Sequence, residues 1–266
     1  MADFPFISNT TKYQPVNALG LGKAAKLAYD SEQKIKKDVS SWGFDRFEFF
    51  DRDETQAFVA GNDDAIIVAF RGTQPTKLQD WVTDADFDLV DGPFGKVHDG
   101  FYRALRVVWR EMLHTIKTFQ DKGQSLWFTG HSLGAALATL AVATLRADDK
   151  PVYGLYTFGH PRTGSRDFAA NFNQDFKPRC FRFVHNNDVV PRVPQRAMNF
   201  SHVGTFLYFD KDGKLDDDLS WWYRLLDSVE GRIEDLGKPG TDGIKDHDMN
   251  KYLKWLEKNK NVDPFA

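Results

Sequence analysis

The stretch FTGHSLGAALATL, from Phe128 to Leu140, constrains the fold of this chain more than any other segment. The run SLWFTG predicts a short strand, and the small apolar residues after the serine predict a long helix. Ser132 stands between them in the pattern G-x-S-x-G, where Gly130 and Gly134 allow the close backbone approach of a sharp turn. A serine that only caps the helix would explain Ser132 but not the paired glycines. The stretch therefore predicts a strand, a tight turn that presents a serine hydroxyl, and a helix.

The rest of the chain also alternates predicted strands and helices. Runs rich in β-branched and aromatic residues predict strands, and apolar residues at helical spacing predict helices. The expected strands cover 47–51, 55–63, 65–72, 125–130, 152–159 and 180–186, and the expected helices cover 100–119, 133–147, 164–176 and 16–37, the last with early breaks at Gly20 and Gly22. This order is typical of an α/β fold with a mainly parallel central sheet flanked by helices. No repeat or linker divides the sequence, so we expect a single domain over residues 1–266.

Composition and charge limit the classes of partner. The formal net charge of −3 gives no reason to expect binding to nucleic acid, and no apolar run approaches the roughly 18 residues of a transmembrane helix. The start, MADFPFISNT, does not resemble a leader, so a cytoplasmic and a leaderless or processed secreted protein are both open. Cys180 is the only cysteine, which predicts a buried thiol and no intrachain disulfide. Without an H-E-x-x-H motif or a cysteine cluster, we expect no metal and no cofactor.

A serine hydroxyl is a weak nucleophile at neutral pH, so chemistry at Ser132 needs a base and an acid that orients the base. In sheets with a serine at such a turn, the acid and then the base follow it along the chain. Asp188 follows the expected strand 180–186, at the sheet edge where Ser132 is expected. We therefore expect Asp188 to be the acid, although it could instead cap the turn before Pro191.

Two histidines follow Asp188 and compete for the role of the base. His247 lies in a polar loop just before an amphipathic helix, a position that suits a catalytic base. His202 lies at the start of a predicted strand, where a bond to backbone is equally plausible. We favour His247, keep His202 as the alternative, and expect His131 and His185 to serve packing and hydrogen bonding.

A negatively charged tetrahedral intermediate needs hydrogen-bond donors. The backbone N–H of Leu133, next to Ser132, is the first candidate. Thr73 is the second, because it follows the expected strand 65–72 and offers both an N–H and a hydroxyl, although Gly-Thr is also ordinary turn chemistry.

The residues after Thr73 predict a short amphipathic helix. Leu78, Trp81, Val82 and Ala85 fall at i, i+3, i+4 and i+7. This helix could be a core element or a movable cover over an apolar cleft. A cover would expose apolar surface when open, which favours an oil or membrane interface.

In their order along the chain, these motifs resemble the class 3 lipases, typified by the fungal triacylglycerol lipases, which have an α/β-hydrolase fold. The matching segments are VAFRGTQ, DWVTDADFDL, GKVHDGFYRAL, FTGHSLGAALATL, YTFGHPRTG, FRFVHNNDVVPRVP and SHVGTFLYF, and they lie between about Ile66 and Phe209. The resemblance implies site residues with these roles: Ser132 as nucleophile, Asp188 as acid, Thr73 and Leu133 as oxyanion donors, a lid around Gln74 to Asp84 that contains Trp81 and Val82, and Val190 in the acyl pocket.

The resemblance implies hydrolysis of acylglycerol esters through an acyl-enzyme, without a cofactor. Phospholipase A1 and feruloyl esterase activities share this machinery, and a binding module without catalysis is the rival from another class. The secreted fungal members carry disulfides and a leader, which this sequence does not show. The segment Leu215 to Pro239, whose helical spacing predicts a packed cap or a membrane contact, separates the last strand from His247, so the choice of base rests on HDMNKYL.

Overall fold

The computed structural model describes residues 4–74, 78, 87–148, 150–217 and 242–266. Within them, a main sheet of eight strands has the order β1-β2-β3-β6-β7-β9-β11-β12. The neighbours from β3 to β11 pair in parallel, and β1, β2 and β12 add antiparallel pairs at the two sides. The bounds are β1 Arg46–Arg52, β2 Thr55–Gly61, β3 Ala65–Phe70, β6 Ser125–His131, β7 Gly154–Phe158, β9 Cys180–His185, β11 Thr205–Phe209 and β12 Leu215–Asp216. The mainly parallel sheet predicted from the sequence is confirmed.

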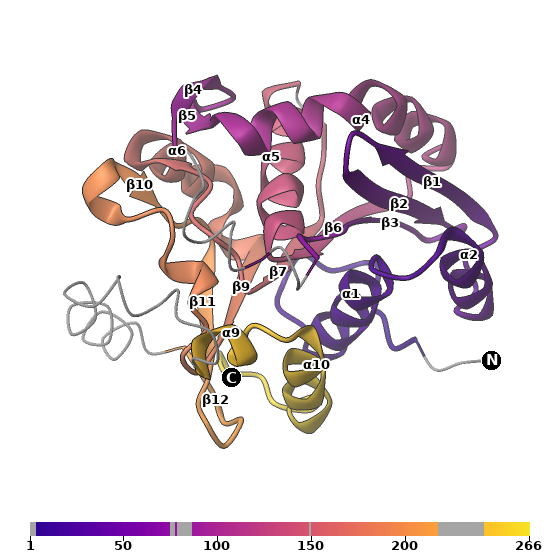
Figure 1. The fold of residues 1–266 in the computed structure, drawn as a ribbon. Helices are drawn as coiled ribbons and strands as arrows, with labels where there is room; N and C mark the ends of the chain where they lie inside the picture. The colour runs from indigo at the N-terminus through magenta and orange to yellow at the C-terminus, as the bar shows by residue number, and fades with distance from the viewer. Residues whose placement is uncertain (1–3, 75–77, 79–86, 149, 218–241) are drawn as a thin grey trace.

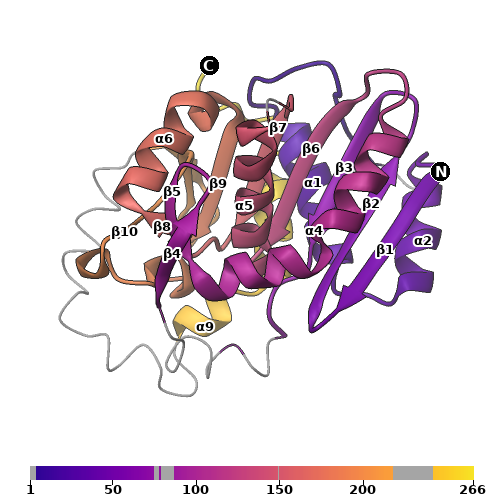
Figure 2. The same ribbon diagram turned by 90° about the horizontal axis from the view of Figure 1, so that it is seen from above.

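Helices cover both faces of this sheet (Figures 1 and 2). One face carries α4, α5 and α6, and the other carries α1, α2 and α10. Strand β3 shows why both faces are covered, because alternate residues enter two different cores: Ile66 packs with the α4 and α5 side, and Ile67 packs with the α1 side. The bounds are α1 Pro15–Leu27, α2 Glu32–Ser41, α4 Asp99–Phe119, α5 Leu133–Ala147, α6 Arg166–Phe176, α9 Asp242–Asp246 and α10 Met249–Lys258.

The prediction of breaks at Gly20 and Gly22 is wrong. Helix α1 runs without interruption through both glycines, and the chain leaves helical structure at residues 28–31, before α2. A Cβ at Gly22 would lie 2.6 Å from Leu256 Cδ1, so the missing side chain lets α10 pack closely on α1. This packing outweighs the helix propensity that glycine loses, which is about 1 kcal/mol per residue.

A second, antiparallel sheet of short strands was not predicted. Its order within the described residues is β10-β8-β5-β4, with bounds β4 Leu89–Gly92, β5 Gly95–His98, β8 Gly164–Ser165 and β10 Phe200–Ser201. Strands of two to four residues leave too little periodicity to detect in a sequence. The sheet lies beside α6 (Figure 2).

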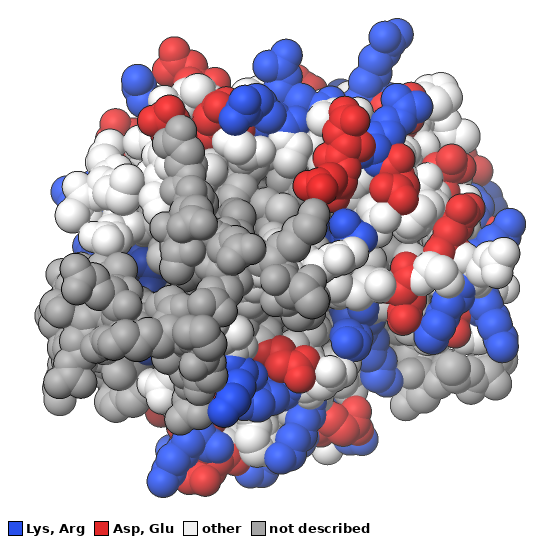
Figure 3. Space-filling model, in the orientation of Figure 1, with Lys and Arg blue, Asp and Glu red and all other residues white. Residues whose placement is uncertain are grey.

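Charged side chains of both signs are interspersed over the described part of the face shown in Figure 3. None of the described helices is long and apolar enough to cross a bilayer. Cys180 is buried in the core as predicted, and burial raises the pKa of its thiol to about 12.

Candidate active site

Ser132 lies at the turn between β6 and α5, in a backbone conformation that only a tight fit sustains. Its φ of 60° and ψ of −132° fall in a region that glycine adopts and other residues avoid. Its N–H donates to the Phe158 carbonyl on β7, 3.0 Å away. A side chain at Gly130 would collide with the backbone of Gly134, and one at Gly134 with the backbone of Phe70 on β3. The two glycines therefore allow the strained turn that the sequence predicted.

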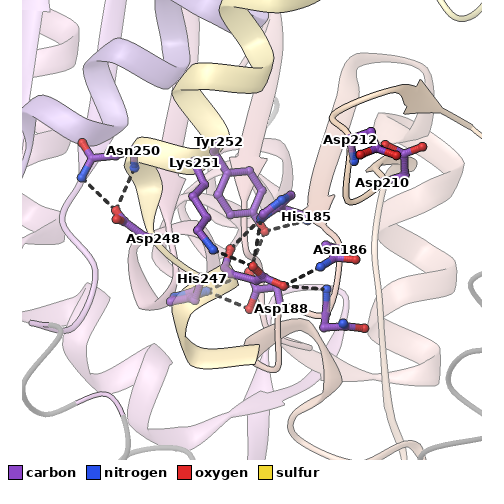
Figure 4. Close-up of polar contacts among 12 residues, drawn as sticks. His185, Asn186, Asp188, Asp210, Asp212, His247, Asp248, Asn250, Lys251 and Tyr252 are labelled. Atoms are coloured by element: carbon purple, nitrogen blue, oxygen red, sulfur yellow. Dashed lines mark hydrogen bonds and ion pairs between the residues drawn. The ribbon is translucent and has the colours of Figure 1, made fainter. Parts of the chain in front are cut away.

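The structure brings Asp188 and His247 into direct contact, although 59 positions separate them (Figure 4). Asp188 follows β9, and His247 lies in the link between α9 and α10. His247 Nδ1 lies 3.0 Å from Asp188 Oδ1 and 2.9 Å from Oδ2, and both side chains are buried. Because a carboxylate only accepts, this contact selects the tautomer in which Nδ1 carries the proton and Nε2 holds the lone pair.

Ser132 and His247 both lie against the Phe158–Gly159 backbone. Ser132 bonds the Phe158 carbonyl, and a Cβ at Gly159 would lie 2.6 Å from His247 Cε1 and 2.9 Å from Asp188 Oδ2. Ser132 Oγ and His247 Nε2 are buried, and neither has a hydrogen-bond partner among the described residues. Unpaired buried polar atoms are costly and rare, and they are typical of sites that complete their bonds with a ligand. The hydroxyl and the imidazole nitrogen are therefore available for chemistry.

The Asp188 carboxylate receives two more hydrogen bonds, which hold it in place. The Val190 N–H donates to Oδ1 at 2.9 Å, and the Tyr252 hydroxyl on α10 donates to Oδ2 at 2.6 Å. Tyr252 is fully buried, and its oxygen accepts from the His185 N–H at 3.0 Å. Burial and the charge of Asp188 raise the pKa of Tyr252, so the hydroxyl keeps its proton and donates. Tyr252 was not predicted, although it lies in HDMNKYL, the same short segment as His247.

Replacing Tyr252 by phenylalanine is expected to lower kcat by about 10- to 100-fold, because a hydrogen bond to a charged group contributes about 1.5–3 kcal/mol. The measurement is ester hydrolysis together with urea unfolding. Tyr156→Phe is the matched control, since Tyr156 is an equally buried tyrosine whose oxygen accepts from the Gln14 N–H and does not bond Asp188. Equal losses of kcat in the two variants would mean that the bond to Asp188 has no specific role.

The two predicted oxyanion donors lie in segments next to Ser132. Leu133 is the first residue of α5, where backbone N–H groups lack partners within the helix. The loop of Gly72 and Thr73 passes beside the serine, since a Cβ at Gly72 would lie 2.9 Å from Ser132 Cβ. Thr73 and His247 line the same cavity of about 600 Å³. The oxyanion roles of Thr73 and Leu133 stay predictions.

The cavity also has apolar walls. Leu78, Ile244 and Met249 contribute to its lining. Val190, predicted for the acyl pocket, is fully buried in a cluster with Leu78, Val189 and Val193, and contact with an acyl chain stays a prediction. The lid residues Trp81 and Val82, and most of the segment from Leu215 to Pro239, lie outside the described residues.

His202 and His131 make hydrogen bonds to the backbone. His202 Nε2 donates to the Pro191 carbonyl at 2.8 Å, and burial holds its pKa well below the usual range. His131 donates from Nε2 to the His247 carbonyl at 2.7 Å and accepts from the Tyr29 hydroxyl at Nδ1. Burial and the neighbouring His247 hold the pKa of His131 well below its usual range, so the ring is neutral. Among the described residues, no group of three or more His, Cys, Asp or Glu is arranged to hold a metal ion.

Comparison with known proteins gives a family. The family model described as lipase (class 3) matches residues 67–198, a range that contains Thr73, Ser132, Leu133 and Asp188 but not His247. A triacylglycerol lipase of Arabidopsis thaliana is 29% identical over 253 residues, covering 70% of this chain and 48% of its own. A secreted mono- and diacylglycerol lipase of Fusarium solani is 37% identical over 212 residues, which cover 76% of this chain and 59% of that protein. The chain spans about half the length of the curated relatives that it matches.

Solved structures show the same fold. One is a triacylglycerol lipase whose catalytic centre is described as a serine protease triad. It aligns with a TM-score of 0.68 at 24% identity, over 87% of this chain and 92% of that one. The α/β-hydrolase fold expected from the sequence is confirmed.

Proposed function

Because the chain belongs to the class 3 lipase family, we propose that it hydrolyses carboxylic esters of the acylglycerol type through Ser132, His247 and Asp188. One observation carries the proposal: Ser132 Oγ and His247 Nε2 are both buried and have no hydrogen-bond partner among the described residues. The two carboxylate oxygens of Asp188 orient the His247 ring through its Nδ1. A hydroxyl, a lone pair and a fixed ring are the parts that acyl transfer to a serine needs.

In the proposed reaction, Ser132 Oγ attacks the ester carbonyl carbon while His247 Nε2 takes the hydroxyl proton. The charge that forms on the carbonyl oxygen is stabilised by the N–H of Leu133 and by Thr73. The intermediate collapses, the alcohol leaves with the proton from His247, and the acyl group stays on Ser132. Water then attacks the acyl-enzyme with His247 as base, which releases the acid and restores the serine.

The substrate class is proposed from the cavity and from the relatives. Its apolar walls at Leu78, Ile244 and Met249 suit an acyl chain, and its polar groups Thr73 and His247 suit the ester. Acylglycerols are the substrates in the names of the two relatives above. Phospholipid and feruloyl esters are the alternatives, and a cover over the cavity at 74–84 stays a prediction from sequence.

A fluorophosphonate probe and a series of p-nitrophenyl esters test the proposal. The folded protein is expected to form one covalent adduct at Ser132, found by mass spectrometry, and to hydrolyse the esters. A step in rate as longer esters pass their solubility limit would support a cover that opens at an interface. An intact protein with neither an adduct nor turnover would leave a lipase-like binding module.

A further inference from the structure

Asp246, which directly precedes His247, is hydrogen-bonded to the loop that carries Asp188. Its Oδ2 accepts from Asn186 Nδ2 at 2.7 Å and from the Asn187 N–H at 3.3 Å. Its backbone carbonyl accepts from His185 Nδ1 at 3.0 Å. Asp246 therefore binds three consecutive residues, and His247 binds the fourth, Asp188.

The contacts fix the position of one chain segment relative to another. Two neighbouring residues, 246 and 247, contact four neighbouring residues, 185–188, and each segment bonds the other several times. Displacement of the His247 backbone away from Asp188 would thus have to break the bonds of Asp246 as well. On the acid side, Asn186 has a φ of 41°, a turn conformation that fixes where its amide points. Catalysis is sensitive to the position of catalytic groups, since a displacement of such a group by about 1 Å can lower the rate about 10²-fold.

The Asp246 carboxylate is suited to this role because it stays ionised. It is 5% exposed, and its Oδ1 pairs with Lys251 Nζ at 2.7 Å. Burial by itself would raise the pKa of Asp246, but the hydrogen bonds from Lys251 and Asn186 outweigh it and hold the pKa below its ordinary value. The Lys251 side chain is 41% exposed, so its ion pair with Asp246 contributes little to the free energy of folding by itself.

We propose that Asp246 is a positioning residue. Its carboxylate accepts hydrogen bonds from the Asn186–Asn187 turn and thereby holds His247 in contact with Asp188. This inference rests on the proposed function, because it assigns Asp246 a part in the same reaction without contact with the ester. The proposal predicts that substitution of Asp246 lowers kcat and leaves KM nearly unchanged, since substrate binding does not depend on the angle of the His247 imidazole.

Asp246→Asn tests the proposal with a change of one charge and almost no change of volume. We expect kcat on p-nitrophenyl butyrate, below its solubility limit, to fall by about 10- to 100-fold with KM nearly unchanged. The rate of fluorophosphonate labelling of Ser132 should fall by the same factor. Circular dichroism and thermal unfolding establish that the variant is folded at the assay temperature.

Two further variants separate positioning from charge and from stability. Asn186→Gly keeps the turn conformation and the charge of Asp246 but removes one bond, and it should lower kcat several-fold without changing KM. Asp210→Asn is the matched control, because the Asp210 carboxylate accepts from the N–H groups of Asp212 and Lys214 in its own turn, apart from His247 and Asp188 in Figure 4. It should lose some stability and keep kcat.

The outcomes are separable. A wild-type protein without adduct or turnover contradicts the proposed function itself. If the wild type is active and folded Asp246→Asn has an unchanged kcat, the positioning role is overturned. It is also overturned if kcat falls as much in Asp210→Asn as in Asp246→Asn. If Asp246→Asn does not fold, Asn186→Gly decides, and an unchanged kcat there overturns the proposal.

Discussion

Ser132→Ala is expected to lower kcat by a factor on the order of 10⁵ or more, with no loss of folding stability. The hydroxyl has no hydrogen-bond partner among the described residues, and it does not cap α5. Its removal therefore breaks no bond, while the proposed reaction loses its nucleophile. Ser132→Gly should be equally inactive and about 1 kcal/mol more stable than Ser132→Ala, because glycine adopts a φ of 60° without steric strain.

Ser165→Ala is the matched control for this prediction. Ser165 caps α6 and accepts a hydrogen bond from the Phe168 N–H at 3.2 Å. Its loss should cost about 1 kcal/mol in the free energy of urea unfolding and leave kcat unchanged. If Ser132→Ala instead lost stability and kept activity, Ser132 would be an ordinary helix cap.

His247→Ala is expected to lower kcat/KM by about 10⁴-fold or more, and His202→Ala to retain most of it. His247 contacts Asp188, whereas His202 donates to the Pro191 carbonyl. His247 is buried and His202 is half-buried, so each truncation should lower the free energy of unfolding by about 1–3 kcal/mol. Similar stability losses with unequal activities would separate the two roles by steady-state kinetics and thermal unfolding. The reverse result would assign the base to His202.

The turn at Ser132 could be predicted because its causes are local. The two glycines and the serine fall within five consecutive residues, with one residue between the serine and each glycine. The strand before them and the helix after them have clear patterns. Asp188 could be placed at the correct sheet edge for a related reason: parallel strands joined by helices end on the same side.

Other features depend on which segments meet. Both His202 and His247 satisfy the order along the chain, and only the folded chain shows which ring contacts Asp188. Tyr252 and Asp246 have no pattern of their own that marks a hydrogen bond to the acid loop. The uninterrupted α1 follows from the close packing of Leu256 on Gly22, a contact between opposite ends of the sequence.

The sequence by itself determined the parallel α/β sheet, the strained serine turn and the edge where the acid lies, because steric and periodic effects act over a few residues. The tertiary structure decided which histidine faces the acid and which side chains hold that pair. These choices depend on distances between segments about 60 residues apart, and packing of the whole chain sets such distances.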